Sequence, residues 1–123
     1  MKNLFYLLIA LLISGCSLKQ EVGQTNSYSI DFNSKNSSYK NIGKSILIEE
    51  PLVNKSFNSR AIFYSQKPYL FEEYAKNRWI NLPSSMIHNS LLESFQNSNL
   101  FSLVSLEDTK IKYDYVLKTS VIK

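Results

Sequence analysis

Cysteine, histidine and glycine are scarce in this sequence, and each shortage excludes a class of site. Cys16 is the only cysteine, so the chain cannot form an internal disulfide or a structural zinc site built on thiolates. His88 is the only histidine, and its place in a helical segment favours a partly exposed helix residue over a catalytic one. The three glycines are scattered, so no glycine-rich loop can cradle a phosphate. We therefore expect no metal site and no bound cofactor.

The acidic residues do not predict a catalytic pair either. They occur as direct neighbours, at Glu49–Glu50, Glu72–Glu73 and Glu107–Asp108. Neighbouring residues of a strand point to opposite faces, so none of these pairs converges on one substrate atom by itself. The net charge of +4 is spread over single lysines, without the concentrated basic patch that nucleic-acid binding usually needs. We expect a protein that is not an enzyme and does not bind nucleic acid.

The N-terminus is typical of a bacterial lipoprotein leader. After Lys2, residues 4–13 form a continuous apolar run, which suits a signal peptide but is too short to span about 30 Å of hydrocarbon. The sequence Ile13-Ser14-Gly15-Cys16 follows and looks like a lipobox, whose thiol takes a diacylglycerol. We predict a signal peptide over 1–15, diacylglycerol and an N-acyl lipid on Cys16, and a polar tether over 16–26. An ordinary secretory leader with an incidental cysteine is the alternative.

Lipidation at Cys16 would decide where the protein resides. Each buried methylene contributes roughly 0.8 kcal/mol, so several acyl chains together hold a protein at a membrane essentially permanently. Ser17, rather than an aspartate, follows the cysteine. By resemblance to lipoproteins of two-membrane bacteria, this favours the outer membrane, facing the periplasm. In a host with one membrane, the same anchor predicts the cell membrane.

The rest of the chain, residues 27–123, predicts one α+β domain. Period-two alternation and short apolar runs indicate strands at Tyr28–Phe32, Ile46–Ile48, Ala61–Ser65, Tyr69–Tyr74, Leu100–Val104 and Tyr113–Ile122. The continuous apolar character of Ile46–Ile48 favours a central strand over an edge strand. We expect a mixed β-sheet of about five strands with one long amphipathic helix packed on one face.

The helix is predicted over Leu82–Gln96, with Pro83 in the first turn, where proline is tolerated. Apolar residues at helical spacing predict a core face formed by Met86, Ile87, Leu91 and Phe95. Trp79 shortly precedes the helix, and we expect it to pack beneath the helix as the largest core residue.

Arg78 and Trp79 are of the residue types that dominate binding hot spots, although a core position is the preferred interpretation for Trp79. Among the exposed aromatics, Tyr69 and Tyr74 in the predicted strand pair are better candidates. We therefore name Tyr69, Tyr74 and Arg78 as candidates for contacts with a partner. Packing on a sheet face explains the two tyrosines equally well, and the sequence does not decide between the two interpretations.

Taken in order, these features resemble the ABC-type transport auxiliary lipoproteins, the family that includes the lipoprotein of the paraquat-inducible intermembrane transport system. In that family a strand, a short hydrophobic segment, an Arg-Trp pair, a helix and a Leu-Phe strand follow one another. The matching segments here are Ile46–Pro51, Arg60–Tyr64, Arg78-Trp79, Leu82–Phe95 and Leu100–Val104. The resemblance covers residues 27–123, and it implies that the C-terminal part of the domain is missing, because family members continue for several more elements.

The resemblance implies a lipid-anchored auxiliary component of an ABC-type system for intermembrane transport of lipids or hydrophobic solutes. The expected partner is a periplasmic subunit of the mammalian-cell-entry-domain type, which the lipoprotein would dock at the outer membrane. A homo-oligomer remains open. The alternative, from another class, is an envelope assembly lipoprotein that itself binds lipid or peptidoglycan. A gene neighbourhood that holds a permease, an ATPase and a cell-entry-domain protein would favour the first function.

Overall fold

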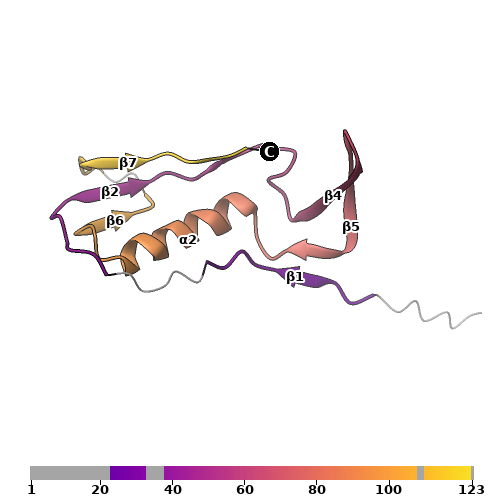
Figure 1. Ribbon diagram of the computed structural model, residues 1–123, viewed down its shortest axis with the longest axis horizontal. Helices are drawn as coiled ribbons and strands as arrows, with labels where there is room; N and C mark the ends of the chain where they lie inside the picture. Colours follow the sequence, from indigo (N-terminus) through magenta and orange to yellow (C-terminus); the bar gives the residue numbers. More distant parts are fainter. Residues whose placement is uncertain (1–22, 33–37, 108–109, 123) are drawn as a thin grey trace, which may run out of the picture.

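The computed structural model of the chain describes residues 23–32, 38–107 and 110–122. The predicted signal peptide, Cys16 and most of the predicted tether lie outside these residues. The strands are β1 (Asn26–Tyr28), β2 (Ser45–Ile48), β3 (Leu52–Val53), β4 (Ala61–Lys67), β5 (Leu70–Trp79), β6 (Leu103–Ser105), β7 (Tyr115–Leu117) and β8 (Ser120–Val121), and the helix is α2 (Pro83–Asn97) (Figure 1). The predicted α+β class is confirmed. The strands fall into three sheets rather than one, in the orders β1-β5-β4, β6-β2-β7 and β3-β8.

The core is built around β2. This strand lies between β6 and β7 and runs parallel to both. Ile46, Leu47 and Ile48 are only 5%, 6% and 0% exposed. Consecutive residues of a strand point to opposite faces, so burial of all three shows that both faces of β2 are covered, which is why its sequence is an uninterrupted apolar run. The prediction of a central strand at Ile46–Ile48 is confirmed.

The long strand predicted over Tyr113–Ile122 is divided into β7 and β8, because its neighbour is interrupted at Pro51. Proline has no N–H to donate to a ladder, and Pro51 separates β2 from β3. On either side of Pro51 the ladder is kept: the Glu49 N–H donates to the Leu117 carbonyl and the Leu52 N–H to the Thr119 carbonyl, each at 3.0 Å. The register moves by one residue across this interruption, since Ile48 pairs with Leu117 and Leu52 with Ser120. β3 and β8 therefore continue the β2 and β7 pair with one residue bulged out.

Helix α2 packs against β2 and β6, and its ends agree with the predicted helix to within one residue. Met86 is buried at 6% exposure, whereas the other predicted core residues of the helix, Ile87, Leu91 and Phe95, are half-buried. The Phe95 ring lies 5.8 Å from that of Phe101, which precedes β6. His88 is half-buried and its Nε2 lies 2.6 Å from the carbonyl oxygen of Ile48. The only histidine thus joins the helix to the central strand, a contact that its sequence position did not predict.

A side chain from a distant loop caps the N-terminus of α2. The N-cap residue Leu82 has no side-chain hydrogen bond to offer, so one of the free N–H groups of the first turn needs another partner. The Ser84 N–H donates to Asn58 Oδ1 at 3.1 Å, and Asn58 Nδ2 donates to Ser84 Oγ at 3.0 Å. The Ser84 hydroxyl in turn donates to Glu50 Oε1 at 2.7 Å. This network ties the loop after β2 and the loop after β3 to the start of the helix.

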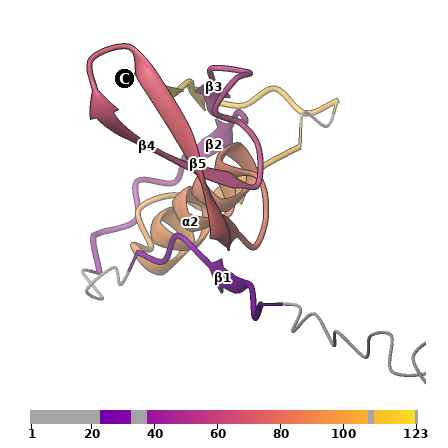
Figure 2. The same ribbon diagram turned by 90° about the vertical axis from the view of Figure 1, so that its right-hand side faces the viewer.

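The sheet β1-β5-β4 forms one end of the molecule (Figures 1 and 2). β4 and β5 are an antiparallel hairpin whose turn contains Tyr69 at a φ of 66°. The strand pair was predicted, but β5 runs ten residues to Trp79, well beyond the predicted end at Tyr74. β1 lies parallel to the last part of β5, with Tyr28 opposite Trp79. The pairing ends there because β5 ends, so the first strand stops at Tyr28 instead of continuing to Phe32.

Candidate functional site

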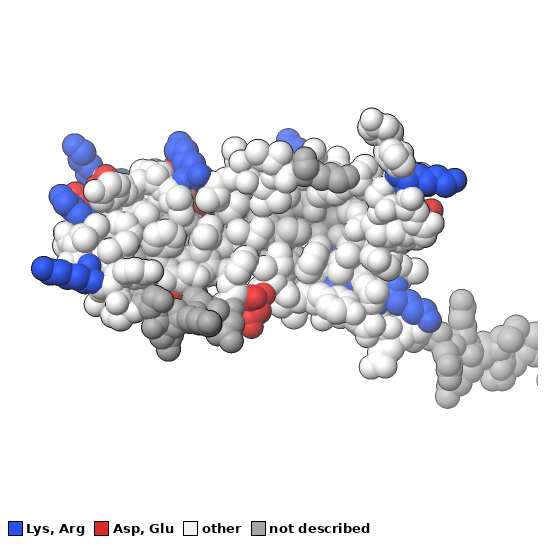
Figure 3. Space-filling model, viewed as in Figure 1, with Lys and Arg blue, Asp and Glu red and all other residues white. Residues whose placement is uncertain are grey.

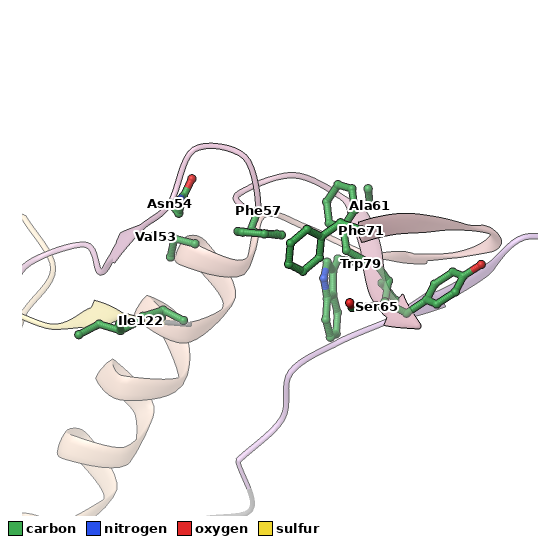
Figure 4. A pocket seen from close by; sticks show the side chains of 12 residues that line it. Val53, Asn54, Phe57, Ala61, Ser65, Phe71, Trp79 and Ile122 are labelled. Atoms are coloured by element: carbon green, nitrogen blue, oxygen red, sulfur yellow. The ribbon is translucent and has the colours of Figure 1, made fainter. Parts of the chain in front are cut away.

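An apolar groove of about 690 Å³ lies between the hairpin β4–β5 and the β3–β8 pair (Figure 4). Its walls come from four strands and from the loop that joins β3 to β4. The lining residues are Val53, Asn54, Phe57, Ala61, Ile62, Phe63, Tyr64, Ser65, Phe71, Trp79, Val121 and Ile122. Pockets of roughly 300–1,000 Å³ with mostly hydrophobic and aromatic walls are the usual form of a small-ligand site. We therefore take this groove as the candidate functional site.

Phe57 is the centre of the aromatic wall. Its ring lies 5.6 Å from that of Phe63 at an interplanar angle of 85°, and 5.3 Å from that of Phe71 at 73°. Both are the edge-to-face geometry that aromatic quadrupoles favour. The indole of Trp79 completes this wall below Phe71 (Figure 4). Trp79 is half-buried and belongs to the groove, a different place from the position beneath the helix that its sequence predicts.

A tight turn after β3 places Phe57 in this wall. The carbonyl of Asn54 accepts hydrogen bonds from the N–H groups of Phe57 at 2.8 Å and Asn58 at 2.9 Å. The Asn54 side chain accepts a third, from the Ser56 N–H at 3.0 Å. Asparagine favours such turns because its side chain bonds the backbone two residues further on. The same turn therefore positions both Phe57 in the groove and Asn58 at the helix N-terminus.

The opposite wall is aliphatic and open to solvent. Val53 of β3 and Ile122 lie across from the aromatic rings (Figure 4). Val121 is 46% exposed and Ile122 is 86% exposed. These two residues, the last that the structure describes, form the more exposed side of the groove.

None of the twelve lining residues is charged. Figure 3 shows lysine and arginine at both ends of the molecule and also along its upper edge, with an acidic group in the lower middle of this face. The titratable group in the lining is Tyr64, whose hydroxyl bonds with Glu72, and this carboxylate raises the pKa of the phenol. Tyr64 therefore stays neutral at ordinary pH. The groove therefore presents an uncharged, mostly aromatic and aliphatic surface, with Asn54, Tyr64 and Ser65 as its polar side chains.

Asp114, the acid with the most strongly perturbed pKa, has a structural role outside the groove. Its Oδ2 accepts hydrogen bonds from the N–H and the hydroxyl of Ser45, both at 2.9 Å, and its Oδ1 lies 3.1 Å from Lys44 Nζ. The hydrogen bond from the Ser45 N–H, the largest cause, together with those from Lys44 and the Ser45 hydroxyl, lowers the pKa of Asp114 to about 2. The carboxylate thus fixes the start of β2 beside the start of β7. Within residues 23–32, 38–107 and 110–122, no group of histidine, cysteine and carboxylate side chains has the arrangement of a metal site.

The three residues predicted to contact a partner lie on β5 or in the turn before it. Tyr69, at the tip of the hairpin, is 98% exposed. Tyr74 is 43% exposed and its ring lies 4.5 Å from that of Tyr64, across the hairpin. Arg78 is exposed near the end of β5, where Ser27 and Ala61 are its strand partners. Sequence patterns did not predict the groove, whose aromatic residues come from a loop and two strands.

The fold and the groove together define a class: a small α+β domain with an uncharged aromatic groove at one end. No protein-family model and no curated protein matches the chain. Among solved structures, the fold is similar to the crystal structure of protein XCC0632 from Xanthomonas campestris, of the family described as DUF330, with a TM-score of 0.66 and 18% identity. The match covers 80% of this chain and 54% of that one, so the chain spans about half the length of that protein. At this identity the likeness establishes the shared fold.

In the described part of the chain, no helix has the length and apolar character needed to cross a membrane.

Proposed function

We propose that this protein is a lipid-anchored auxiliary component of an ABC-type intermembrane transport system for lipids or other hydrophobic solutes. Its role is to dock the periplasmic, cell-entry-domain subunit at the outer membrane. The predicted signal peptide over 1–15, followed directly by Cys16, supports the anchor, and the ordered sequence features over residues 27–123 support the family. In this proposal the protein acts through its surfaces and not through catalysis.

The observation that carries the docking role is the exposed hairpin β4–β5. Tyr69 at its tip, and Leu70, Phe71 and Tyr74 along β5, are exposed. Clustered exposed apolar side chains mark interaction sites on soluble domains. β4 is also an edge strand of its sheet, and an edge strand can accept a strand from a partner. The hairpin therefore combines apolar contact area with a backbone template for pairing.

The alternative function, an envelope assembly lipoprotein, has two forms, lipid binding and peptidoglycan binding, and the groove favours the first. An envelope assembly lipoprotein that binds peptidoglycan would need polar and charged groups for its sugars and peptide acids, whereas the twelve groove residues carry no charge. Lipid binding is the form of the alternative that the groove supports. It is compatible with docking, because Tyr69 at the hairpin tip is not among the residues that line the groove, although Phe71 belongs to both surfaces.

Co-purification of the cell-entry-domain subunit with the full chain, isolated from cells in mild detergent, tests the docking role. Tyr69→Lys places a charge at the hairpin tip and should reduce recovery of the subunit. Tyr39→Lys is the matched control, because Tyr39 is also exposed, at 56%, but lies outside the hairpin. Recovery of the subunit should be unchanged in the control. If the wild-type chain recovers no subunit, the docking role is wrong.

A further inference from the structure

We propose that the domain lies on the membrane through a basic patch, made up of Arg60, Lys76 and Arg78, which binds the anionic headgroups of the bilayer that holds the anchor. This inference rests on the proposed function for the anchor at Cys16. It deepens that function, because it fixes which side of the domain faces the lipid.

Two members of the basic patch share one face near the end of β5. Alternate residues of a strand point to the same face, so Lys76 and Arg78 lie on one face and Trp79, which lines the groove, lies on the other. Arg78 stands between Ser27 of β1 and Ala61 of β4, which are both small, and both basic residues are exposed. Lys76 and Arg78 are therefore on the face of the sheet that is turned away from the groove.

Arg60 adds a third positive charge at the same end of β5. Its carbonyl accepts the N–H of Trp79 at 2.8 Å, and its Nε donates to the Trp79 carbonyl at 3.1 Å. These two bonds fix Arg60 beside the strand position that follows Arg78. Arg60 is exposed, so its guanidinium keeps further N–H groups for an external acceptor such as a phosphate oxygen.

The basic patch forms no ion pair within the described part of the chain. The two ion pairs found among the described residues involve Lys44 and Lys118, which lie outside the hairpin. The carboxylates of β5, Glu72 and Glu73, lie toward the hairpin tip, beyond the irregular register between Ala61 and Phe63. Three positive charges without a carboxylate partner complement an anionic surface.

The path of the chain favours lipid headgroups over an acidic protein as that surface. Gly23 lies against the side chain of Lys76, at the hairpin end of the molecule (Figure 1). Gly23 is seven positions after Cys16, and a fully extended chain of this length reaches at most roughly 25 Å. Tyr74, two residues before Lys76, is 43% exposed, and tyrosine beside basic residues is typical of membrane interfaces. The patch thus lies on the part of the domain tied most closely to the predicted lipid.

The reactivity of Lys76 tests this orientation directly. The full lipidated chain is reconstituted into vesicles of phosphatidylethanolamine mixed with either phosphatidylglycerol or phosphatidylcholine. Lysines are acetylated with an N-hydroxysuccinimide ester, and mass spectrometry gives the rate at each one. Because each basic residue near an anionic leaflet favours the bound orientation about fivefold, acetylation of Lys76 should be at least about fivefold slower in the phosphatidylglycerol vesicles. Lys40, an exposed lysine outside the sheet β1-β5-β4, should react equally in both.

Salt and three variants assign the protection to the basic patch. Sodium chloride at about 1 M, where the screening length is about 3 Å, should remove the protection of Lys76. Arg78→Gln should speed acetylation of Lys76 in phosphatidylglycerol vesicles by about fivefold, whereas Arg78→Lys keeps the charge and should keep the protection. Lys112→Gln makes the same charge change at an exposed position before β7 and should have no effect. Circular dichroism checks that each variant is folded.

Equal acetylation of wild-type Lys76 in the two kinds of vesicle would overturn the inference, whatever the variants show. So would protection by an added cell-entry-domain subunit without protection by phosphatidylglycerol, since the patch would then bind an acidic protein. The mass of the peptide that contains Cys16 checks the anchor separately. A lipidated Cys16 with unprotected Lys76 would refute the basic patch and leave the proposed function intact. Failure of subunit co-purification with Lys76 protected would do the reverse.

Discussion

Asn58→Ala tests whether a loop residue, 26 positions away in sequence, caps the single described helix. In the wild type, Asn58 Oδ1 accepts the Ser84 N–H and Asn58 Nδ2 donates to Ser84 Oγ. Replacement of a capping side chain by alanine costs about 1 kcal/mol, within a range of about 0.5–2. Ser84 is only 2% exposed, so its hydroxyl also loses a donor that water does not replace, which adds about 1 kcal/mol. We expect a total loss of about 2 kcal/mol in the free energy of unfolding.

This loss is large enough to measure by thermal unfolding. One kcal/mol shifts the Tm of a domain of this size by about 4–8 °C, so the Tm of Asn58→Ala should fall by about 8–16 °C. The fall should be followed by circular dichroism in the far ultraviolet, with urea unfolding at fixed temperature to give the free energy itself. An unchanged m-value would show that the variant unfolds from the same compact state.

Two further variants separate the cap from general effects of substitution. Asn58→Asp keeps the acceptor and adds a negative charge at the helix N-terminus, which is favourable, but loses the donor to Ser84 and approaches Glu50. Its stability should lie between those of the wild type and Asn58→Ala. Asn89→Ala changes an exposed helix position and should be neutral or slightly stabilising, because alanine is the best helix former. If Asn58→Ala unfolds within about 0.5 kcal/mol of the wild type, the capping network does not stabilise the helix.

Three other changes have defined outcomes. The pKa of Asp114 is about 2 in the folded protein, below its ordinary value of 3.8. The stability that the Asp114 carboxylate contributes is therefore complete above about pH 4 and is lost as the pH falls through about 2. Asp114→Asn should be less stable than the wild type near neutral pH and should lose less stability on acidification, as measured by urea midpoints across this range. Met86→Ala should cost about 2–5 kcal/mol, because Met86 is buried between α2 and the central sheet, and a urea midpoint that does not move would contradict this. Cys16→Ser should abolish incorporation of a clickable palmitate analogue in cells, and absence of label in the wild type would refute lipidation.

Local sequence patterns predicted the elements that are specified within one short segment. Ile46–Ile48 is apolar throughout because both faces of β2 are buried, and its central position was predicted from that apolar run. Pro83 and the apolar spacing located α2 to within one residue, because proline in the first turn and the 3.6-residue period act within the helix itself. The strand pair at Ala61–Ser65 and Tyr69–Tyr74 was also predicted, and it corresponds to the hairpin β4–β5.

Elements whose ends depend on a neighbour were predicted less well. β1 stops at Tyr28 because β5 stops at Trp79, and the last strand divides because Pro51 interrupts the strand beside it. β6 starts at Leu103, whereas a strand from Leu100 was predicted, because its ladder with β2 begins where Ser45 pairs with Leu103. The length of a strand depends on how far it pairs with its neighbour, so the alternation of apolar and polar residues within one segment does not specify where the strand ends.

By itself, the sequence determined the α+β class, the central strand, the helix and the hairpin, because each of these follows from backbone preferences and side-chain periodicity within a short segment. Only the tertiary structure decided which residues meet. Phe57, Phe63, Phe71 and Trp79 form one groove wall although they lie in a loop and two strands, and Asn58 caps a helix that begins 25 residues later. Trp79 lines that wall because β5 continues as a strand through it. Such contacts join segments that are distant in sequence, so they depend on how the strands bend and pack, which no local pattern specifies.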